Sequence, residues 1–322
     1  MEADVLDRAA LRRAFRGARL VFHTAGVVGT RPAERVWRVN ALGPRLAVEA
    51  AAAAGVERVV VTSSVGGVGP ATLGRAGRED DVYRGGGLGL TYVDSKHEGE
   101  SEALAAGARC GIEVVVVNPA YVLGVPVDRS QPGETSTRII GNYLRGRLPA
   151  VVDSATNIVH VEDVALGHLL AAERGQPGER YILGGENVRW VELFERVAEL
   201  SGVRRPLLVI PVEAAEAIAA AGSMSGRLMI SPEAFGLMAQ DWRYSSQKAR
   251  SELDYRPRGL DRTLRETVAW YQELLAAGAL GAGRPSPMSL GSLGVRVAGR
   301  TGGLRMLQAV GSWTGRRLVA NG

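Results

Sequence analysis

Three polar side chains in the first third of the chain have the spacing of an acid/base site. Ser64 follows an apolar run, and a Tyr-x-x-x-Lys pair follows at Tyr92 and Lys96. Residues four apart share one face of a helix, so the phenol and the ammonium are expected to point into the same space. The cation is predicted to lower the tyrosine pKa, which allows the phenol to exchange a proton with a substrate hydroxyl or carbonyl. A serine hydroxyl at the end of the preceding strand would hold the same oxygen.

A second Tyr-x-x-x-Lys pair competes for this role. The chain has only two lysines, Lys96 and Lys248, and each has a tyrosine four residues earlier. One of the two serines after Tyr244 is expected to cap a helix, which leaves Tyr244 outside it. We therefore assign catalysis to the first pair and expect Tyr244→Phe to leave turnover largely unchanged. The alternative for the first pair is a solvated helix face.

The elements that must position these residues alternate β-branched runs with helical patterns, which is typical of a parallel α/β sheet. The strand runs are apolar on both faces, as a sheet covered by helices requires. A break is expected near Gly43-Pro44, and Asp7 is expected to cap the first helix. Strands are predicted at 20–23, 58–62 and 113–117, and helices at 7–17, 33–54, 92–105, 163–174, 190–201 and 262–276.

Several motifs resemble the extended short-chain dehydrogenases/reductases of the NAD-dependent epimerase/dehydratase family. The resemblance covers residues 4–271 and implies an α/β fold: a truncated Rossmann-type doubly wound parallel sheet with a smaller C-terminal substrate-binding region. The superfamily motifs are Ser64 with Gly69 five residues later, Tyr92-x-x-x-Lys96, and Asn118 to Gly124. The motifs similar to the dihydroflavonol-reductase-like branch, which includes hopanoid-associated sugar epimerases, are Val159 to Ala165, Gly178 to Asn187, and Tyr244 to Pro257.

This resemblance implies a role for each matching residue. Tyr92 would be the acid/base, Ser64 the carbonyl-polarising hydroxyl, and Lys96 a partner that also binds the nicotinamide ribose of NAD or NADP. For the other positions the alternative is a turn or core residue. The implied cofactor-binding residues are Asp4 and Val5 at the adenine, Ala25, Gly26, Thr62 and Ser63 along the cleft, Tyr92 and Lys96, and Pro119 and Val122 beside the nicotinamide.

The sequence departs from the family at its beginning. A first βαβ unit with a glycine-rich turn that binds pyrophosphate does not precede Asp4, and roughly sixty residues of it are missing. The preference between NAD and NADP therefore cannot be read. Either the start is set too far downstream, which the intact catalytic set favours, or the chain is degenerate. As written, the chain is expected to bind dinucleotide poorly and to leave the strand at 20–23 on an open edge.

The function implied is that of an NAD(P)-dependent oxidoreductase or epimerase acting on a secondary alcohol or ketone of a small molecule. The alternative is a catalytically silent binding or regulatory protein with a degenerate fold of the same family. A sugar-nucleotide 4,6-dehydratase is disfavoured, because Val65-Gly66 stand where that subclass carries an Asp-Glu pair. No motif identifies the substrate. The resemblance also implies a homodimer formed through the helix bearing Tyr92 and a helix over 46–53.

Composition sets the remaining expectations. A chain of 322 residues with 46% hydrophobic residues can bury a sizeable core. The single Cys110 excludes an internal disulfide and is expected in the core, and the charged N-terminus is unlike a signal peptide, which predicts a cytoplasmic protein. No segment reads as a transmembrane span, and the four histidines show no metal-ligand spacing. We expect a partial dinucleotide-binding domain over 1–125, to which a helix at 161–174 and a strand near 180–184 return, and a mainly substrate-binding region over 126–275.

The last segment, 276–322, is expected to be a separate basic tail. The chain has a net charge of +5, yet six arginines and no acidic residue follow Leu274, which leaves about −1 for the rest. The body therefore offers no basic face, and no nucleic-acid partner is predicted. The Gly, Ser and Pro content favours disorder of the tail. The alternative is a weak amphipathic helix over 304–319 on an anionic membrane surface.

Overall fold

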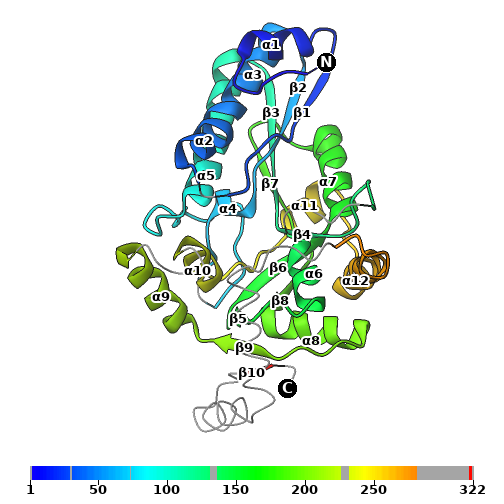
Figure 1. Cartoon of the computed structure of the whole chain (residues 1–322). Coiled ribbons are helices and arrows are strands. Elements are labelled where there is room, and N and C mark those ends of the chain that lie inside the picture. Colours follow the sequence, from blue (N-terminus) through cyan, green and yellow to red (C-terminus); the bar gives the residue numbers. More distant parts are fainter. Residues whose placement is uncertain are drawn as a thin grey trace. The chain divides into compact units, whose positions relative to one another are not determined.

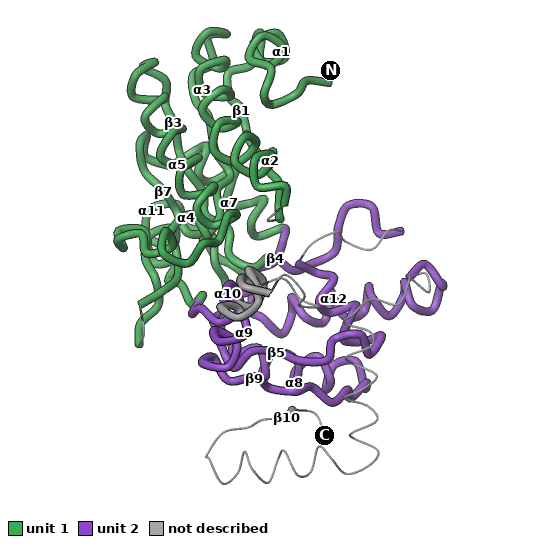
Figure 2. Tube along the Cα trace, turned by 60° about the vertical axis from the view of Figure 1, so that its left-hand side comes forward, with its two compact units in different colours: residues 1–121, 162–185, 242–257 green, residues 122–161, 186–241, 258–322 purple. Residues whose placement is uncertain are grey.

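The chain folds into two compact units in the computed structural model (Figure 2). Ser64, Tyr92 and Lys96 all belong to unit 1. Unit 1 comprises Met1–Tyr121, Glu162–Gly185 and Trp242–Pro257, and unit 2 comprises Val122–Val161, Glu186–Asp241 and Arg258–Gly322. The structure describes residues 2–29, 31–72, 74–130, 136–225, 232–280 and 319–320.

A four-stranded parallel sheet, in the order β1-β2-β3-β7, lies at the centre of unit 1 (Figure 1). Valine side chains such as Val60 and Val115 are fully buried in it, because helices cover both faces. The strands predicted at 20–23 and 58–62 are confirmed, and the third predicted strand extends two residues further. The strands are β1 (Leu20–His23), β2 (Arg58–Thr62), β3 (Glu113–Pro119) and β7 (Arg180–Leu183).

Helices pack on both sides of this sheet, with α3 and α5 on one side and α7 on the other (Figure 1). The predicted cap is confirmed, since the Asp7 carboxylate accepts hydrogen bonds from the backbone N–H groups of Ala9 and Ala10. The helices of this unit are α1 (Arg8–Ala14), α2 (Ala33–Trp37), α3 (Gly43–Ala53), α4 (Val65–Val68), α5 (Thr91–Cys110), α7 (Val161–Arg174, from its second residue) and α11 (Gln247–Glu252).

The break expected near Gly43-Pro44 is a π-helical turn, η1 (Arg38–Leu42), that joins α2 to α3. The crossing of α5 explains its position. A Cβ atom on Gly99 of α5 would lie 1.9 Å from the Asn40 carbonyl oxygen, so the two backbones meet without a side chain between them. Only glycine permits this approach.

Strand β1 forms an open edge of the sheet within the described part of the chain, as expected, since it pairs with β2 alone. Its outward-facing side chains Leu20 and Phe22 are 38% and 37% exposed. Unpaired backbone groups and exposed apolar side chains together favour association with another strand.

Unit 2 is built on two three-stranded sheets, β4-β6-β8 and β5-β9-β10. Aromatic side chains fill its core, where the Phe194 ring lies 5.0 Å from that of Tyr143. The helix predicted at 190–201 is confirmed, and the one predicted at 262–276 begins two residues earlier. The elements are β4 (Tyr121–Leu123), α6 (Arg138–Leu144), β5 (Ala150–Val152), β6 (Ala155–His160), β8 (Glu186–Arg189), α8 (Trp190–Ser201), β9 (Leu207–Ile210), α9 (Val212–Ser225), α10 (Pro232–Ala239), α12 (Leu260–Ala276) and β10 (Val319–Ala320).

Strand β10, near the end of the predicted tail, pairs in antiparallel fashion with β9; residues 281–318 and 321–322 of that segment lie outside the described residues, so disorder of the tail stays a prediction. One expectation is corrected by these elements. Cys110 is exposed rather than buried, because it is the last residue of α5, where Gly111 turns the chain away with a φ of 67°. Within the described ranges, no helix has both the length and the apolar character needed to cross a membrane.

Candidate active site

The residues that follow β2 form a tight turn, Ser64–Gly69, here named the serine loop. Ser64 caps the four-residue helix α4, and its Oγ accepts a hydrogen bond of 3.1 Å from the Gly66 backbone N–H. Such a cap fixes the serine side chain, because it satisfies a helix N–H group that has no partner within the helix. The hydroxyl is thereby held at the carboxyl end of β2.

Tyr92 lies in the first turn of α5, and its ring and the Ser64 hydroxyl face the same space: a Cβ atom on Gly66 would be 3.6 Å from Tyr92 Cε1 and 3.5 Å from Ser64 Oγ. Burial raises the pKa of Tyr92, and the nearby Ser64 hydroxyl opposes this only in part. The prediction that Lys96 lowers the pKa of Tyr92 is therefore wrong, because this pKa is raised. Spacing on a helix indicated a neighbouring cation but not the burial of the phenol, which disfavours the phenolate. Tyr92 is thus a proton donor near neutral pH.

Lys96 lies one turn further along α5 and is 8% exposed. Its Nζ donates a 3.1 Å hydrogen bond to the Thr62 carbonyl at the end of β2. Burial lowers the pKa of Lys96 to about 8, against the opposing charge of Glu100. The ammonium also reaches the turn after β1, where a Cβ atom on Gly26 would be 3.1 Å from Nζ. Gly26 therefore leaves the space that Lys96 occupies.

Two side-chain polar atoms at the carboxyl ends of β1 and β2 are buried without a hydrogen-bond partner, the His23 Nε2 and the Ser63 Oγ. Burial, followed by the charge of Lys96, lowers the pKa of His23 to about 4, so this imidazole is neutral at physiological pH. Both residues follow or end neighbouring parallel strands, at the edge where open α/β sheets bind ligands. Unpaired polar atoms at this edge, together with the ammonium of Lys96, fit the hydroxyl groups of a nicotinamide ribose.

The other predicted cofactor residues fall in three places. Ala25 follows β1, and Pro119 ends β3 at the same carboxyl edge of the sheet, while the Thr62 hydroxyl bonds His168 on α7 at 2.8 Å. Asp4 and Val5 precede α1, and Val122 lies on β4 and belongs to unit 2. The Asp4 carboxylate accepts from the Leu6 backbone N–H at 2.9 Å, and Val5 packs near Gly43.

One buried amide in this region was not predicted. Asn40 lies in the π-helical turn and is 1% exposed. Its side chain bonds both backbone groups of Val27, at 2.8 and 2.9 Å, and donates to the Ser95 hydroxyl. It therefore fixes the turn after β1 that contains Gly26. The signal for it was a single polar residue inside an apolar helical pattern, but a π-helical turn has no signature that reveals where such a side chain points.

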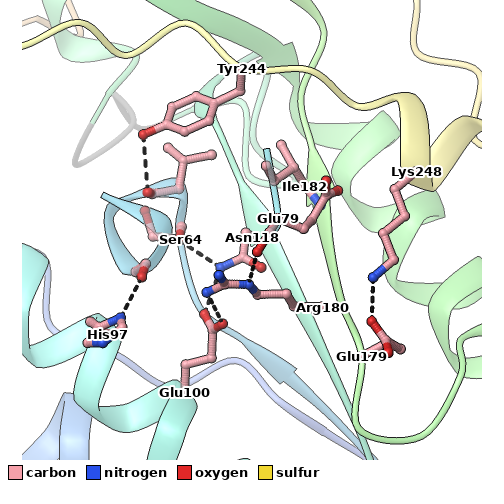
Figure 3. A network of polar contacts seen from close by, with 12 residues as sticks. Ser64, Glu79, His97, Glu100, Asn118, Glu179, Arg180, Ile182, Tyr244 and Lys248 are labelled. Atoms are coloured by element: carbon pink, nitrogen blue, oxygen red, sulfur yellow. Dashed lines mark hydrogen bonds and ion pairs between the residues drawn. The ribbon is translucent and has the colours of Figure 1, made fainter. Parts of the chain in front are cut away.

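Three side chains from other elements hold the serine loop by its carbonyl oxygens (Figure 3). Tyr244 lies outside α11, as predicted, and its hydroxyl forms hydrogen bonds with two of these carbonyls. Lys248 instead pairs with Glu179. The contacts on the loop are Asn118 to Ser64, His97 to Gly67, and Tyr244 to both Val65 and Gly69.

The parallel sheet, with a serine loop after one strand and a Tyr/Lys helix after it, has the architecture of an extended short-chain dehydrogenase/reductase of Rossmann type. The family model described as the NAD dependent epimerase/dehydratase family matches residues 1–184. The chain belongs to this family.

Individual relatives agree with this assignment. A protein of Synechocystis sp. named for dihydroflavonol 4-reductase is 32% identical over 275 residues, covering 81% of this chain and 78% of its own. Sterol demethylase protein B of Methylococcus capsulatus is 32% identical over 279 residues, covering 84% of each chain. The crystal structure of gox2253 superposes with a TM-score of 0.74 at 30% identity, covering 84% of this chain and 83% of that one.

Proposed function

We propose that the chain is an NAD(P)-dependent oxidoreductase that interconverts a ketone and a secondary alcohol of a small molecule, with Ser64, Tyr92 and Lys96 as its catalytic residues. The observation that carries the proposal is that the Ser64 hydroxyl and the Tyr92 ring lie against the same space at Gly66, and that the buried ammonium of Lys96 lies one helical turn after Tyr92. Two hydroxyls that face one space can bind one substrate oxygen from two sides. The name of the dihydroflavonol 4-reductase relative supports the same direction of chemistry.

The protein residues supply the proton and the positioning. Nicotinamide, when bound, gives a hydride to the carbonyl carbon or takes it from the alcohol carbon. In reduction the substrate oxygen accepts the Tyr92 proton as it gains negative charge, while the Ser64 hydroxyl donates a hydrogen bond to it. The raised pKa of Tyr92 keeps that proton in place until the oxygen becomes basic enough to take it.

Lys96 then stabilises the phenolate that remains. Its ammonium is held by the Thr62 carbonyl, so it is oriented before substrate binds. The same ammonium, and the unpaired polar atoms of Ser63 and His23 at the carboxyl edge of the sheet, offer polar contacts to the nicotinamide ribose. Gly26, Ala25 and Pro119 complete the set of residues that would hold the cofactor.

Epimerisation uses the same residues twice. An alcohol is oxidised, and the ketone is reduced on its opposite face, with no net consumption of cofactor. The family description names epimerases, so epimerisation of an alcohol is assayed together with reduction of a ketone.

The test is turnover by the 322-residue chain with NADH or NADPH and a panel of cyclic and aryl ketones, followed by nicotinamide absorbance and product analysis. Tyr92→Phe should lower turnover by about 10² or more, because the acid is lost while the ring remains. Tyr143→Phe is the matched control, since that hydroxyl lies in the core of unit 2.

Undiminished turnover in Tyr92→Phe would refute the assigned role. Stereochemical exchange of an alcohol without cofactor consumption would identify an epimerase. No turnover under conditions in which a fluorescence titration shows that NADH or NADPH is bound would refute the proposal and favour a catalytically silent binding protein.

A further inference from the structure

Glu100 is a buried carboxylate that the proposed chemistry does not use. It lies on α5 one turn after Lys96 and is 4% exposed. Its Oε1 accepts from Arg180 Nη1 and its Oε2 from Asn118 Nδ2, each at 2.8 Å (Figure 3). A buried ionised group is costly unless such partners compensate it, so the position requires an explanation.

The Asn118 amide links Glu100 to the serine loop. Its Nδ2 donates to Glu100 and also to the Ser64 carbonyl, at 2.9 Å. Both partners are acceptors, so the reversed amide would place its oxygen against two oxygens. The charge of Glu100 therefore selects the one orientation in which Asn118 holds the backbone of Ser64.

The serine loop also lies directly on this carboxylate. A Cβ atom on Gly67 would be 3.0 Å from Glu100 Oε2 and 2.7 Å from the Ser63 hydroxyl. Such distances leave no room for a side chain. Glu100 thus contacts the loop at Gly67 and holds it through Asn118 at Ser64.

Charged and titratable groups around Lys96 and Glu100 come from three elements. Arg180, on β7, pairs with Glu100 and also donates from its Nε to the Glu79 carbonyl at 2.7 Å. Lys96 and Tyr92 lie on α5, and His23, on β1, is neutral because burial lowers its pKa. The negative charge of Glu100 raises the pKa of Lys96 against the larger effect of burial.

We propose that Glu100 is a positioning residue for both halves of the site: it fixes the serine loop through Asn118, and its negative charge stabilises the ammonium of Lys96. A catalytic importance of the serine loop and of Lys96 rests on the proposed function. The effect of Glu100 on each of them can be measured without turnover. Arg180 sets the strength of the charge effect, because its own positive charge pairs with the Glu100 carboxylate and offsets part of its negative charge.

The chain has only two lysines, which makes the test direct. In a Lys248→Arg background, lysine labelled with carbon-13 at Cε gives a single side-chain signal, and its shift against pH reports the titration of Lys96. The midpoint of this parent protein is expected near 8. Glu100→Gln should lower the midpoint by about one pH unit, because an opposite charge is removed. Arg180→Gln should raise it, because the cation that offsets part of the Glu100 charge is removed.

Glu179→Gln is the matched control. Glu179 lines the same cavity of unit 1 as Glu100 and Arg180, but it pairs with Lys248 and should leave the Lys96 midpoint unchanged. A purely structural role for Glu100 predicts no shift, or shifts of the same sign in both test variants, and either result overturns the proposal. If Glu100→Gln does not fold, Arg180→Gln is sufficient as a test: a Lys96 midpoint that does not rise in this variant overturns the proposal.

The proposed hold of Glu100 on the serine loop through Asn118 is tested by hydrogen exchange. The Gly67 backbone N–H donates to the Ser64 carbonyl, the same oxygen that Asn118 holds. Glu100→Gln and Asn118→Ala should each speed exchange at Gly67 by about tenfold, and Glu179→Gln should not. Unchanged exchange in both variants would overturn the link to the serine loop. A lack of NAD(P)-dependent activity would refute the proposed function without affecting either measurement.

Discussion

Acid should destabilise the chain partly through His23, and replacing this residue by leucine should remove that part. The imidazole is 5% exposed at the end of β1, and its Nε2 has no hydrogen-bond partner. Burial, and then the charge of Lys96, lowers its pKa from 6.5 to about 4. Protonation in the folded state is therefore disfavoured, whereas the unfolded chain accepts the proton readily.

The sign and size of this pH-dependent change in the free energy of unfolding follow from the linkage between proton binding and folding. A lowered folded-state pKa gives stability that is complete above 6.5 and is lost as the pH falls toward 4, because only the unfolded state binds the proton in that window. At about 1.4 kcal/mol per pKa unit, the full shift corresponds to about 3 kcal/mol, of which about 2.5 kcal/mol is lost by about pH 4.5. This is a large fraction of the stability of an ordinary domain.

The assay is urea unfolding of wild type and His23→Leu at pH 7 and at about pH 4.5. The wild type should lose about 2 to 3 kcal/mol more than the variant over this interval, while other titrating groups act equally in both. Leu11→Ala, a core variant without a titratable group, should follow the wild type at a constant offset. Parallel pH curves for wild type and His23→Leu would refute the reasoning.

Two further predictions concern packing at the serine loop and on α5. Tyr244→Phe removes hydrogen bonds to two loop carbonyls without touching the acid, so turnover should fall by about threefold to tenfold with an unchanged pH profile. A loss as large as that expected for Tyr92→Phe would contradict this. Gly99→Ala forces a Cβ against the Asn40 carbonyl and should cost about 2 to 3 kcal/mol in urea unfolding, whereas Gly87→Ala, in open space, should cost almost nothing. Equal stabilities would show that the helix crossing can relax.

The strands, and the placement of Tyr92 and Lys96 on one helix after the strand that ends at Thr62, could be predicted because their signals are local. A run of valines from Val59 to Val61 marks a buried strand by itself, and the four-residue spacing of Tyr92 and Lys96 places both on one helix face. The same local reasoning located the cap at Asp7 and excluded Tyr244 from its following helix. Each of these inferences needs fewer than ten residues of sequence.

What could not be predicted depends on partners far apart in sequence. Arg180 lies 80 residues after Glu100, and nothing near either residue marks the other as its partner. The sign of the Tyr92 pKa shift was wrong for the same reason, since burial is set by the whole unit rather than by the helix. Tyr244 was dismissed on its helix position, although its hydroxyl serves a loop 175 residues earlier.

The 175 residues between Gly69 and Tyr244 separate the serine loop from its partner during synthesis of the chain. Translation proceeds from the N-terminus, so Ser64, Tyr92 and Lys96 leave the ribosome long before the segment Trp242–Pro257 that completes unit 1. Until Tyr244 emerges, the carbonyls of Val65 and Gly69 lack its hydroxyl, and the turn that aims the serine is held by fewer bonds. A nascent chain thus contains Ser64, Tyr92 and Lys96 well before it contains the tyrosine that holds the serine loop.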